Sequence, residues 1–222
     1  MLHLLFGRAG SGKTETTRRR LGQLAKAGRE RLFLLVPEQA SFVNERAILQ
    51  LLGPRLAGKV QVLSFSRLCD ALFRQYGGSA GRRLDDGGRA VFMSLAVESV
   101  KDTLQYYRRS AEGIELVHLL LDANAEFHSC GIGPEDLRTA AAQTESPALR
   151  QKLTELAQIL AAYAALVAQD WIDPQEDLDR AAATLQSHPF FADAVVFVDG
   201  YQSFTKQQYA VLRPILRQAA EV

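Results

Sequence analysis

The chain has 222 residues, of which 47% are hydrophobic and 23% are charged, which suits one globular domain or one domain with a large insertion. Its net charge of +1 gives no overall field, so any contact with nucleic acid must be local. The chain has two cysteines without C-x-x-C spacing, Cys69 and Cys130, which argues against disulfides, zinc ribbons and iron–sulfur clusters in this chain and fits a reducing cytoplasm. No apolar run reaches the length that spans a membrane.

The first predicted elements are a strand, a glycine-rich loop and a helix. Residues 2–6 are an apolar run typical of a buried parallel strand, and residues 15–27 have helical periodicity. Between them, residues 7–14 read GRAGSGKT and match the phosphate-loop pattern G-x-x-x-x-G-K-[ST].

Each residue type in this loop has a physical reason. Glycines let backbone N–H groups approach a triphosphate, and the following helix directs its positive end at the phosphates. Lys13 can reach the β- and γ-phosphates, and Thr14 can ligate Mg²⁺. The residues predicted to bind the nucleotide are Gly7, Arg8, Ala9, Gly10, Ser11, Gly12, Lys13 and Thr14.

The next elements continue an alternation of strands and helices. We expect a strand at 31–36, a helix at 38–52 that ends at Gly53 and Pro54, a strand at 60–65 and a helix at 66–76. A crossing from residues 2–6 to 31–36 through one helix makes a right-handed βαβ unit.

The character of the chain changes between residues 82 and 186, where Ala, Leu, Glu, Gln and Arg recur at helical spacing without strand runs. We expect helices near 88–100, 112–129, 134–144, 148–169 and 174–185. This segment is predicted to be a helical insertion whose edges, at 77–81 and 187–189, act as hinges.

A last strand is expected at 194–198, followed directly by Asp199. In a parallel sheet this carboxylate would lie beside the phosphate loop and hold Mg²⁺ together with Thr14. A helix at 207–216 follows. The fold class predicted is α/β, a P-loop NTPase sheet with helices on both faces.

Four segments carry a family resemblance: GRAGSGKT, LVPEQASF, VLSFSRLCDALFRQYG and VVFVDGYQSFTKQQYAVL. Their order resembles the first motor domain of superfamily 1 helicases, and most closely the B subunit of AddAB-type (RexB-type) helicase–nucleases. The resemblance implies a RecA-like domain 1A at 1–81 and 187–222, and a domain 1B-like insertion at 82–186. It also implies ATP and Mg²⁺ as ligands, DNA ends and the A subunit as partners, and a role in double-strand-break repair.

The chain departs from the family pattern after Asp199. Superfamily 1 motors usually read Asp-Glu-x-Gln-Asp, whereas this chain has Gly200 in place of the glutamate; Gln202 matches and is a possible sensor of the nucleotide. We therefore expect weak or absent motor activity. The resemblance also implies an N-terminal fragment, with a second motor domain and an iron–sulfur nuclease module in the remainder.

Segments after the second and third strands are expected to touch single-stranded DNA, as the resemblance implies. Their hydroxyl, amide and guanidinium groups suit phosphate oxygens, and an aromatic ring can stack on a base. The candidates are Ser41, Phe42, Asn44, Ser64, Phe65, Ser66 and Arg67. For each phenylalanine, core packing is an equal alternative.

Two other functions stay open on the residues alone. One is a small-molecule kinase, with the long insertion as a lid over the acceptor. The other is a structural scaffold for a partner protein, with a phosphate loop that no longer binds nucleotide.

Overall fold

The computed structural model describes all residues except 109, 110 and 112. The chain forms two compact units, which are described separately. The first comprises 1–79 and 177–222, and the second comprises 80–176. None of the described helices is long and apolar enough to cross a membrane.

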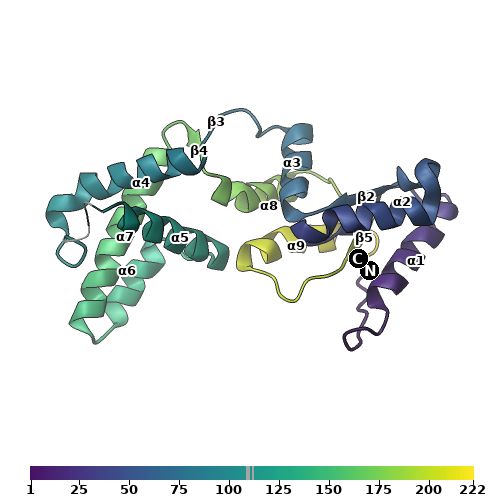
Figure 1. Cartoon of the computed structure of the whole chain (residues 1–222), viewed down its shortest axis with the longest axis horizontal. Helices are drawn as coiled ribbons and strands as arrows, with labels where there is room; N and C mark the ends of the chain where they lie inside the picture. Colours follow the sequence, from purple (N-terminus) through teal and green to yellow (C-terminus); the bar gives the residue numbers. More distant parts are fainter. Residues whose placement is uncertain (109–110, 112) are drawn as a thin grey trace. The chain divides into compact units, whose positions relative to one another are not determined.

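The first unit is built on a small parallel sheet of β1 (Leu32–Leu35), β2 (Val60–Leu63) and β5 (Val195–Val198), in the order β2-β1-β5 (Figure 1). Leu32 is level with Val60 on one side and with Val195 on the other. The strands at 31–36, 60–65 and 194–198 are therefore confirmed. β1 is buried along its whole length, as a central parallel strand covered on both faces must be.

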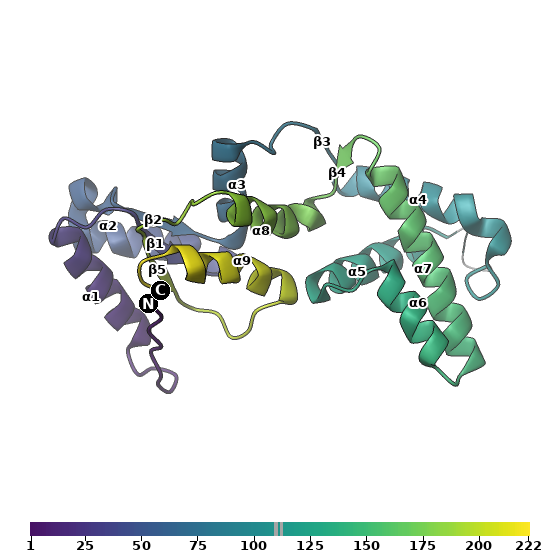
Figure 2. The same ribbon diagram turned by 180° about the vertical axis from the view of Figure 1, so that it is seen from behind.

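Helices cover both faces of this sheet because successive side chains of β1 point to opposite sides. Leu32 and Leu34 pack with one cluster, which includes α1 (Lys13–Lys26) and α2 (Ser41–Ala57). Phe33 and Leu35 pack with the other cluster, formed by α3 (Phe65–Tyr76), α8 (Asp177–Ser187) and α9 (Lys206–Gln218). Figure 2 gives the same elements from behind. The α/β class is confirmed.

Turns at the strand and helix ends follow the local sequence. A 3-10 helix, η1 (Glu38–Ala40), connects β1 to α2. Gly53 has φ 69° and interrupts α2 before Pro54, yet the helix resumes and reaches Ala57. The predicted end at Gly53 and Pro54 is thus a kink, because glycine adopts the left-handed region and proline fits the first turn of a new helical segment.

The predicted buried strand at 2–6 is wrong for the described structure. Residues 1–6 have no strand assignment, and the apolar side chains in the run are exposed, with Phe6 at 84%. Only the first three residues form a backbone ladder, with residues 220–222. Beyond His3 no strand in the described chain lies beside the segment, so its backbone has no ladder and its side chains have no cover.

The second unit is a helical bundle. Its elements are α4 (Asp86–Val100), η2 (Lys101–Thr103), α5 (Ile114–Cys130), α6 (Pro134–Gln143), α7 (Pro147–Val167) and η3 (Pro174–Glu176). Met93, Val117, Ile159 and other apolar side chains form its core. The helices expected here are present, although the expected start at Glu112 lies outside the described residues.

Two features of the second unit differ from the sequence expectation. A two-stranded parallel pair, β3 (Arg82–Arg83) with β4 (Trp171–Ile172), occurs where no strand was expected. α8 was placed in the insertion, but it packs in the first unit against α3 and α9. Its apolar face, with Ala181, Ala182 and Leu185, has helical spacing that suits either core, so spacing alone could not assign it.

Candidate functional site

The glycine-rich loop ends where α1 begins. Gly10 has φ 77° and Gly12 has φ 80°, a left-handed conformation that residues with a Cβ adopt only at a cost. Gly12 precedes Lys13, the first residue of α1, and provides no side-chain cap. The first-turn N–H groups of α1 are therefore available to an anion, which the helix dipole also favours.

The ammonium of Lys13 closes this loop. Its Nζ donates hydrogen bonds to the carbonyl of Gly7 at 2.8 Å and to the carbonyl of Arg8 at 2.9 Å. An ammonium has three N–H donors, so one remains for an anion bound at the start of α1. Thr14, which follows in the first turn, is half-buried.

Backbone hydrogen bonds place the first three residues of the chain relative to β5. Val195 of β5 forms a parallel bridge with Glu221. Met1 N donates to Ala220 O at 2.7 Å, Val222 N donates to Met1 O at 2.9 Å, and His3 N donates to Val222 O at 2.7 Å. This alternation is that of a parallel ladder, in which Met1 is level with Glu221 and hence with Val195.

No described hydrogen bond continues this ladder beyond His3, so it does not extend to the residues that lead into the loop. Asp199 directly follows β5, at the carboxyl edge of the sheet. Asp199 N donates to Leu35 O at 3.0 Å, and its side chain is half-buried. Within the described residues, no hydrogen bond or ion pair joins it to Lys13 or Thr14.

The residue after Asp199 is held by a close contact between two loops. Gly200 has φ 83°, and a Cβ built on it would lie 3.2 Å from Pro37 Cδ. A glutamate at this position would therefore need both a left-handed backbone and a shift of the proline. Sequence reasoning gave Pro37 a role only at the end of the second strand, because its contact with Gly200 joins loops more than 160 residues apart.

Aromatic packing holds the rest of that loop. The Tyr201 ring lies 5.6 Å from the Phe65 ring and 4.9 Å from the Phe204 ring, measured between centroids. Burial, and then the charge of Glu38, raise the pKa of Tyr201, so its hydroxyl stays protonated at neutral pH. Gln202, the predicted sensor, is exposed.

Four of the seven candidates for DNA contact are buried, namely Ser41, Asn44, Ser64 and Phe65. Ser64 Oγ accepts from Arg67 N at 3.2 Å and caps α3. Asn44 Oδ1 accepts from Arg18 Nη2 at 2.9 Å. Ser41 Oγ has no hydrogen-bond partner among the described residues. These side chains serve packing and capping in this structure.

The other three candidates are on the surface. The Phe42 side chain is 71% exposed, and Ser66 and Arg67 are exposed at the start of α3. Arg67 is paired with Glu45 of α2. An exposed pair of this kind contributes little stability, so a phosphate could replace the carboxylate at small cost.

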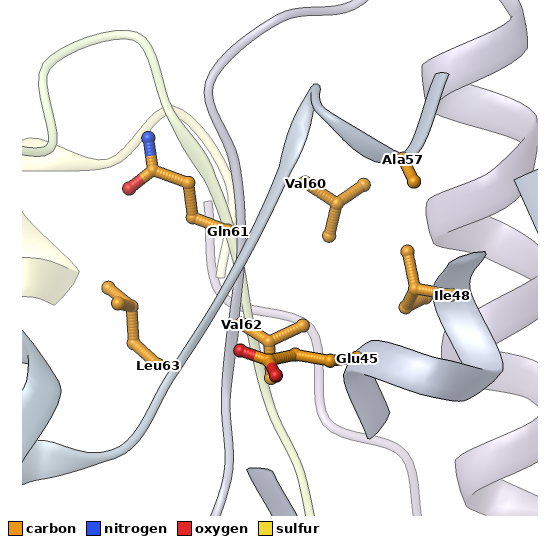
Figure 3. A pocket seen from close by; sticks show the side chains of 7 residues that line it. All are labelled: Glu45, Ile48, Ala57, Val60, Gln61, Val62 and Leu63. Carbon is orange, nitrogen blue, oxygen red and sulfur yellow. The ribbon is translucent and has the colours of Figure 1, made fainter. Parts of the chain in front are cut away.

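One hollow of about 340 Å³ lies at the free edge of β2. Figure 3 shows Ile48 and Ala57 on the α2 side, with Val60 and Val62 from the strand and the Glu45 carboxylate near Val62. Its lining is largely apolar and includes no residue of the glycine-rich loop, so it is not the phosphate site.

Comparison with known proteins identifies one family. The family described as ADDB, N-terminal, matches residues 4–222. The chain is also similar to proteins that are each named as the B subunit of an ATP-dependent helicase/deoxyribonuclease. It is 30% identical to that of Acetivibrio thermocellus over its whole length, which is 20% of the relative. It is 31% identical to that of Thermoanaerobacter sp. (strain X514), again over its whole length and 19% of the relative. The chain thus spans about a fifth of these relatives.

Proposed function

The chain belongs to the family of AddB N-terminal domains, and on this premise we propose that it binds Mg·ATP at residues 7–14 and contacts single-stranded DNA nearby. In the longer protein this would be the helicase-like part of a helicase–nuclease B subunit that works with an A subunit on DNA ends. The observation that carries the proposal is the glycine-rich loop itself, in which Gly10 and Gly12 have positive φ and Lys13 closes the loop at the uncapped start of α1.

The order of the parallel segments supports a RecA-like, P-loop identity for the first unit. Reading outward from β2, the segments are β1, β5, residues 220–222 and residues 1–3. The chain thus passes from residues 1–3, at one side of β5, through α1 to β1, at the other side of β5. In open parallel sheets, ligands bind outside the carboxyl ends of the strands, at the point where the order of the strands reverses in this way.

The donor set fits magnesium. Mg²⁺ is usually bound through one or two protein oxygens together with substrate phosphates and water. Thr14 and Asp199 would supply those protein oxygens, and among the described residues no cluster of three or more metal-binding side chains competes for the ion. The ion would neutralise charge on the β- and γ-phosphates, while Lys13 and the α1 amides hold and orient them.

Hydrolysis at motor rates is not part of the proposal. Gly200 has no side chain with which to polarise an attacking water, and loss of such a group commonly costs about a hundred- to ten-thousand-fold. The Pro37 contact gives this position a structural role of its own. Nucleotide binding would therefore stabilise a DNA-bound state, with little turnover by this chain.

Binding of a fluorescent ATP analogue tests the site. Lys13→Ala removes a charge-assisted contact of about 1.5–3 kcal/mol, so affinity should fall about ten- to hundredfold. Lys26→Ala, at the exposed far end of α1, is the matched control and should bind as the wild type does. Equal affinity for both variants would mean that the loop is not the site.

Two further assays distinguish the proposed function from the alternatives. Phosphate release in the presence of single-stranded DNA should stay below about 1 s⁻¹, the low end of ordinary enzymes. ADP formation that nucleosides stimulate without phosphate release would support a kinase, because the phosphoryl group then passes to the nucleoside. In a DNA-binding assay, Arg67→Ala should lower the affinity for single-stranded DNA. Arg74→Ala, which changes another exposed arginine of the same helix, should leave that affinity unchanged.

A further inference from the structure

A second hollow lies on the first unit between α8 and α9, the helices that Figures 1 and 2 show side by side. Its volume is about 460 Å³, and Arg213, Arg217, Gln186 and Pro214 are among its lining residues. Among the described residues that line it there is no aromatic side chain. The lining therefore combines two cations and two amides with the small or aliphatic residues Leu185, Ala210 and Pro214.

One half-buried amide of the lining, that of Gln218, is held by several hydrogen bonds. Gln218 Nε2 donates to the carbonyls of Leu185 and His188, and Gln218 Oε1 accepts from Phe191 N at 3.0 Å. These bonds join the end of α9 to the end of α8. The arginines thus project from a wall whose polar groups are already satisfied.

Arg213 and Arg217 are available to a ligand. They are four residues apart on α9, so their side chains leave the helix on the same face, about 5–6 Å apart at Cβ. Both are exposed, and within the described chain neither makes a hydrogen bond or an ion pair. α9 has no acidic residue, with Lys206 as its third cation.

The acidic residues of α8 do not neutralise this pair. Asp177 is paired with Arg180, and Asp179 accepts from Gln207 Nε2 at 2.7 Å. Both carboxylates lie in the first turn of α8, whereas Leu185 and Gln186 of the last turn line the hollow. The local charge at the hollow is therefore positive although the chain as a whole is nearly neutral.

The hollow is distinct from the nucleotide site. α9 starts at Lys206, shortly after Asp199 at the carboxyl edge, and its 13 residues extend about 20 Å at 1.5 Å per residue. It ends just before Glu221, which is level with Val195 at the amino end of β5. The arginines therefore lie toward the amino edge of the sheet, away from Asp199, and no residue of the glycine-rich loop lines the hollow.

We propose that Arg213 and Arg217 bind the phosphodiester backbone of nucleic acid, as a second contact separate from the glycine-rich loop. A guanidinium matches a phosphate with two parallel N–H donors, and two of them on one helix face can hold one phosphate or two successive ones. Recognition of this kind is independent of base sequence. The proposal rests on the proposed function only for the identity of the nucleic acid as DNA.

The test compares two double variants that remove the same charge. Arg213→Gln/Arg217→Gln is compared with Arg138→Gln/Arg150→Gln, two exposed arginines of the second unit. Fluorescence anisotropy with a mixed-sequence single-stranded oligonucleotide is measured over a series of salt concentrations. The hollow variant should bind at least about tenfold more weakly, and its slope of log K against log salt should be about 1.4 smaller, because each single-strand phosphate contact adds about 0.7.

Additional variants distinguish a loss of charge from a loss of geometry, and a defect at the hollow from a defect at the nucleotide site. Arg213→Lys/Arg217→Lys keeps the charge and should retain the wild-type salt slope, with weaker binding than wild type. Lys13→Ala should lose the ATP analogue and keep this slope, whereas the hollow variant should keep the ATP analogue, so failure of either site is seen separately. Equal losses in the two double variants would overturn the proposal. Binding of inorganic phosphate by the wild type without any DNA defect in the hollow variant would also overturn it, in favour of a small-anion site.

Discussion

Replacing Gly200 tests why this chain lacks a glutamate after Asp199. Gly200 has φ 83°, and a Cβ there would lie 3.2 Å from Pro37 Cδ. The left-handed backbone costs a residue with a Cβ about 1–2 kcal/mol, and the tight contact adds to this cost because Pro37 must shift by a few tenths of an ångström. We therefore expect Gly200→Ala to destabilise the protein by about 2 kcal/mol.

Thermal unfolding gives a direct measurement of this cost. In a chain of 150–250 residues, 1 kcal/mol shifts Tm by about 2–4 °C, so Gly200→Ala should melt about 4–8 °C below the wild type. Gly58→Ala is the control, because Gly58 has φ −62° and nothing lies within 4 Å of its Cβ position. Its Tm should be unchanged or slightly raised.

Gly200→Glu extends the test to chemistry. It should melt at least as low as the alanine variant and should not restore ATP hydrolysis with DNA, because the carboxylate would enter through a strained loop. A variant that keeps the wild-type Tm and releases phosphate above about 1 s⁻¹ would refute this reasoning and show that the glutamate alone is missing.

Two further predictions concern the helical unit and its edges. Glu155 is 1% exposed and accepts the N–H groups of 105–107; burial would raise its pKa, but these bonds and the one from Gln151 hold its pKa below the usual range. The stability that the Glu155 carboxylate contributes is therefore complete above the unfolded pKa of about 4.3, and it is lost as pH falls through the pKa of the folded state. In denaturant titrations, Glu155→Gln should lower the free energy of unfolding by about 2–4 kcal/mol at pH 7 and by much less near pH 3. Limited proteolysis should cut first at 77–81, because this segment is mostly exposed and rich in glycine. Residues 187–189 should resist cleavage, because the carbonyl of His188 accepts a hydrogen bond from Gln218. Early cleavage at 187–189 would contradict the unit boundaries.

The sequence alone determined those features that depend on neighbours along the chain. Helix positions followed from apolar spacing, and strands β1 and β5 followed from short apolar runs ended by Pro37 and Asp199. Two of the three glycines of residues 7–14, Gly10 and Gly12, stood where the backbone has positive φ. The family also followed from ordered local segments, and the match over residues 4–222 confirms it.

Only the tertiary structure decided which of these residues are buried and what they touch. The apolar run at 2–6 lacks a neighbouring strand beyond His3, and a strand without a partner cannot be recognised as such from its own residues. Phe42 and Phe65 were equivalent in sequence, yet Phe42 is exposed and Phe65 packs on Tyr201. Burial depends on distant segments that share a core, and local patterns contain no information about which ones those are.

The nucleotide site and the arginine-lined hollow likewise depend on segments that are distant in the sequence. Chain order could suggest that Asp199 and the loop share a sheet edge, whereas the backbone bonds between residues 1–3 and 220–222 fix only the first three residues beside the sheet. The Gly200–Pro37 contact and the hollow with Arg213 and Arg217 each join segments far apart in sequence or on different helices. The kinds of residue needed for anion binding can be identified in the sequence, whereas their common location is set by how the helices pack on the sheet.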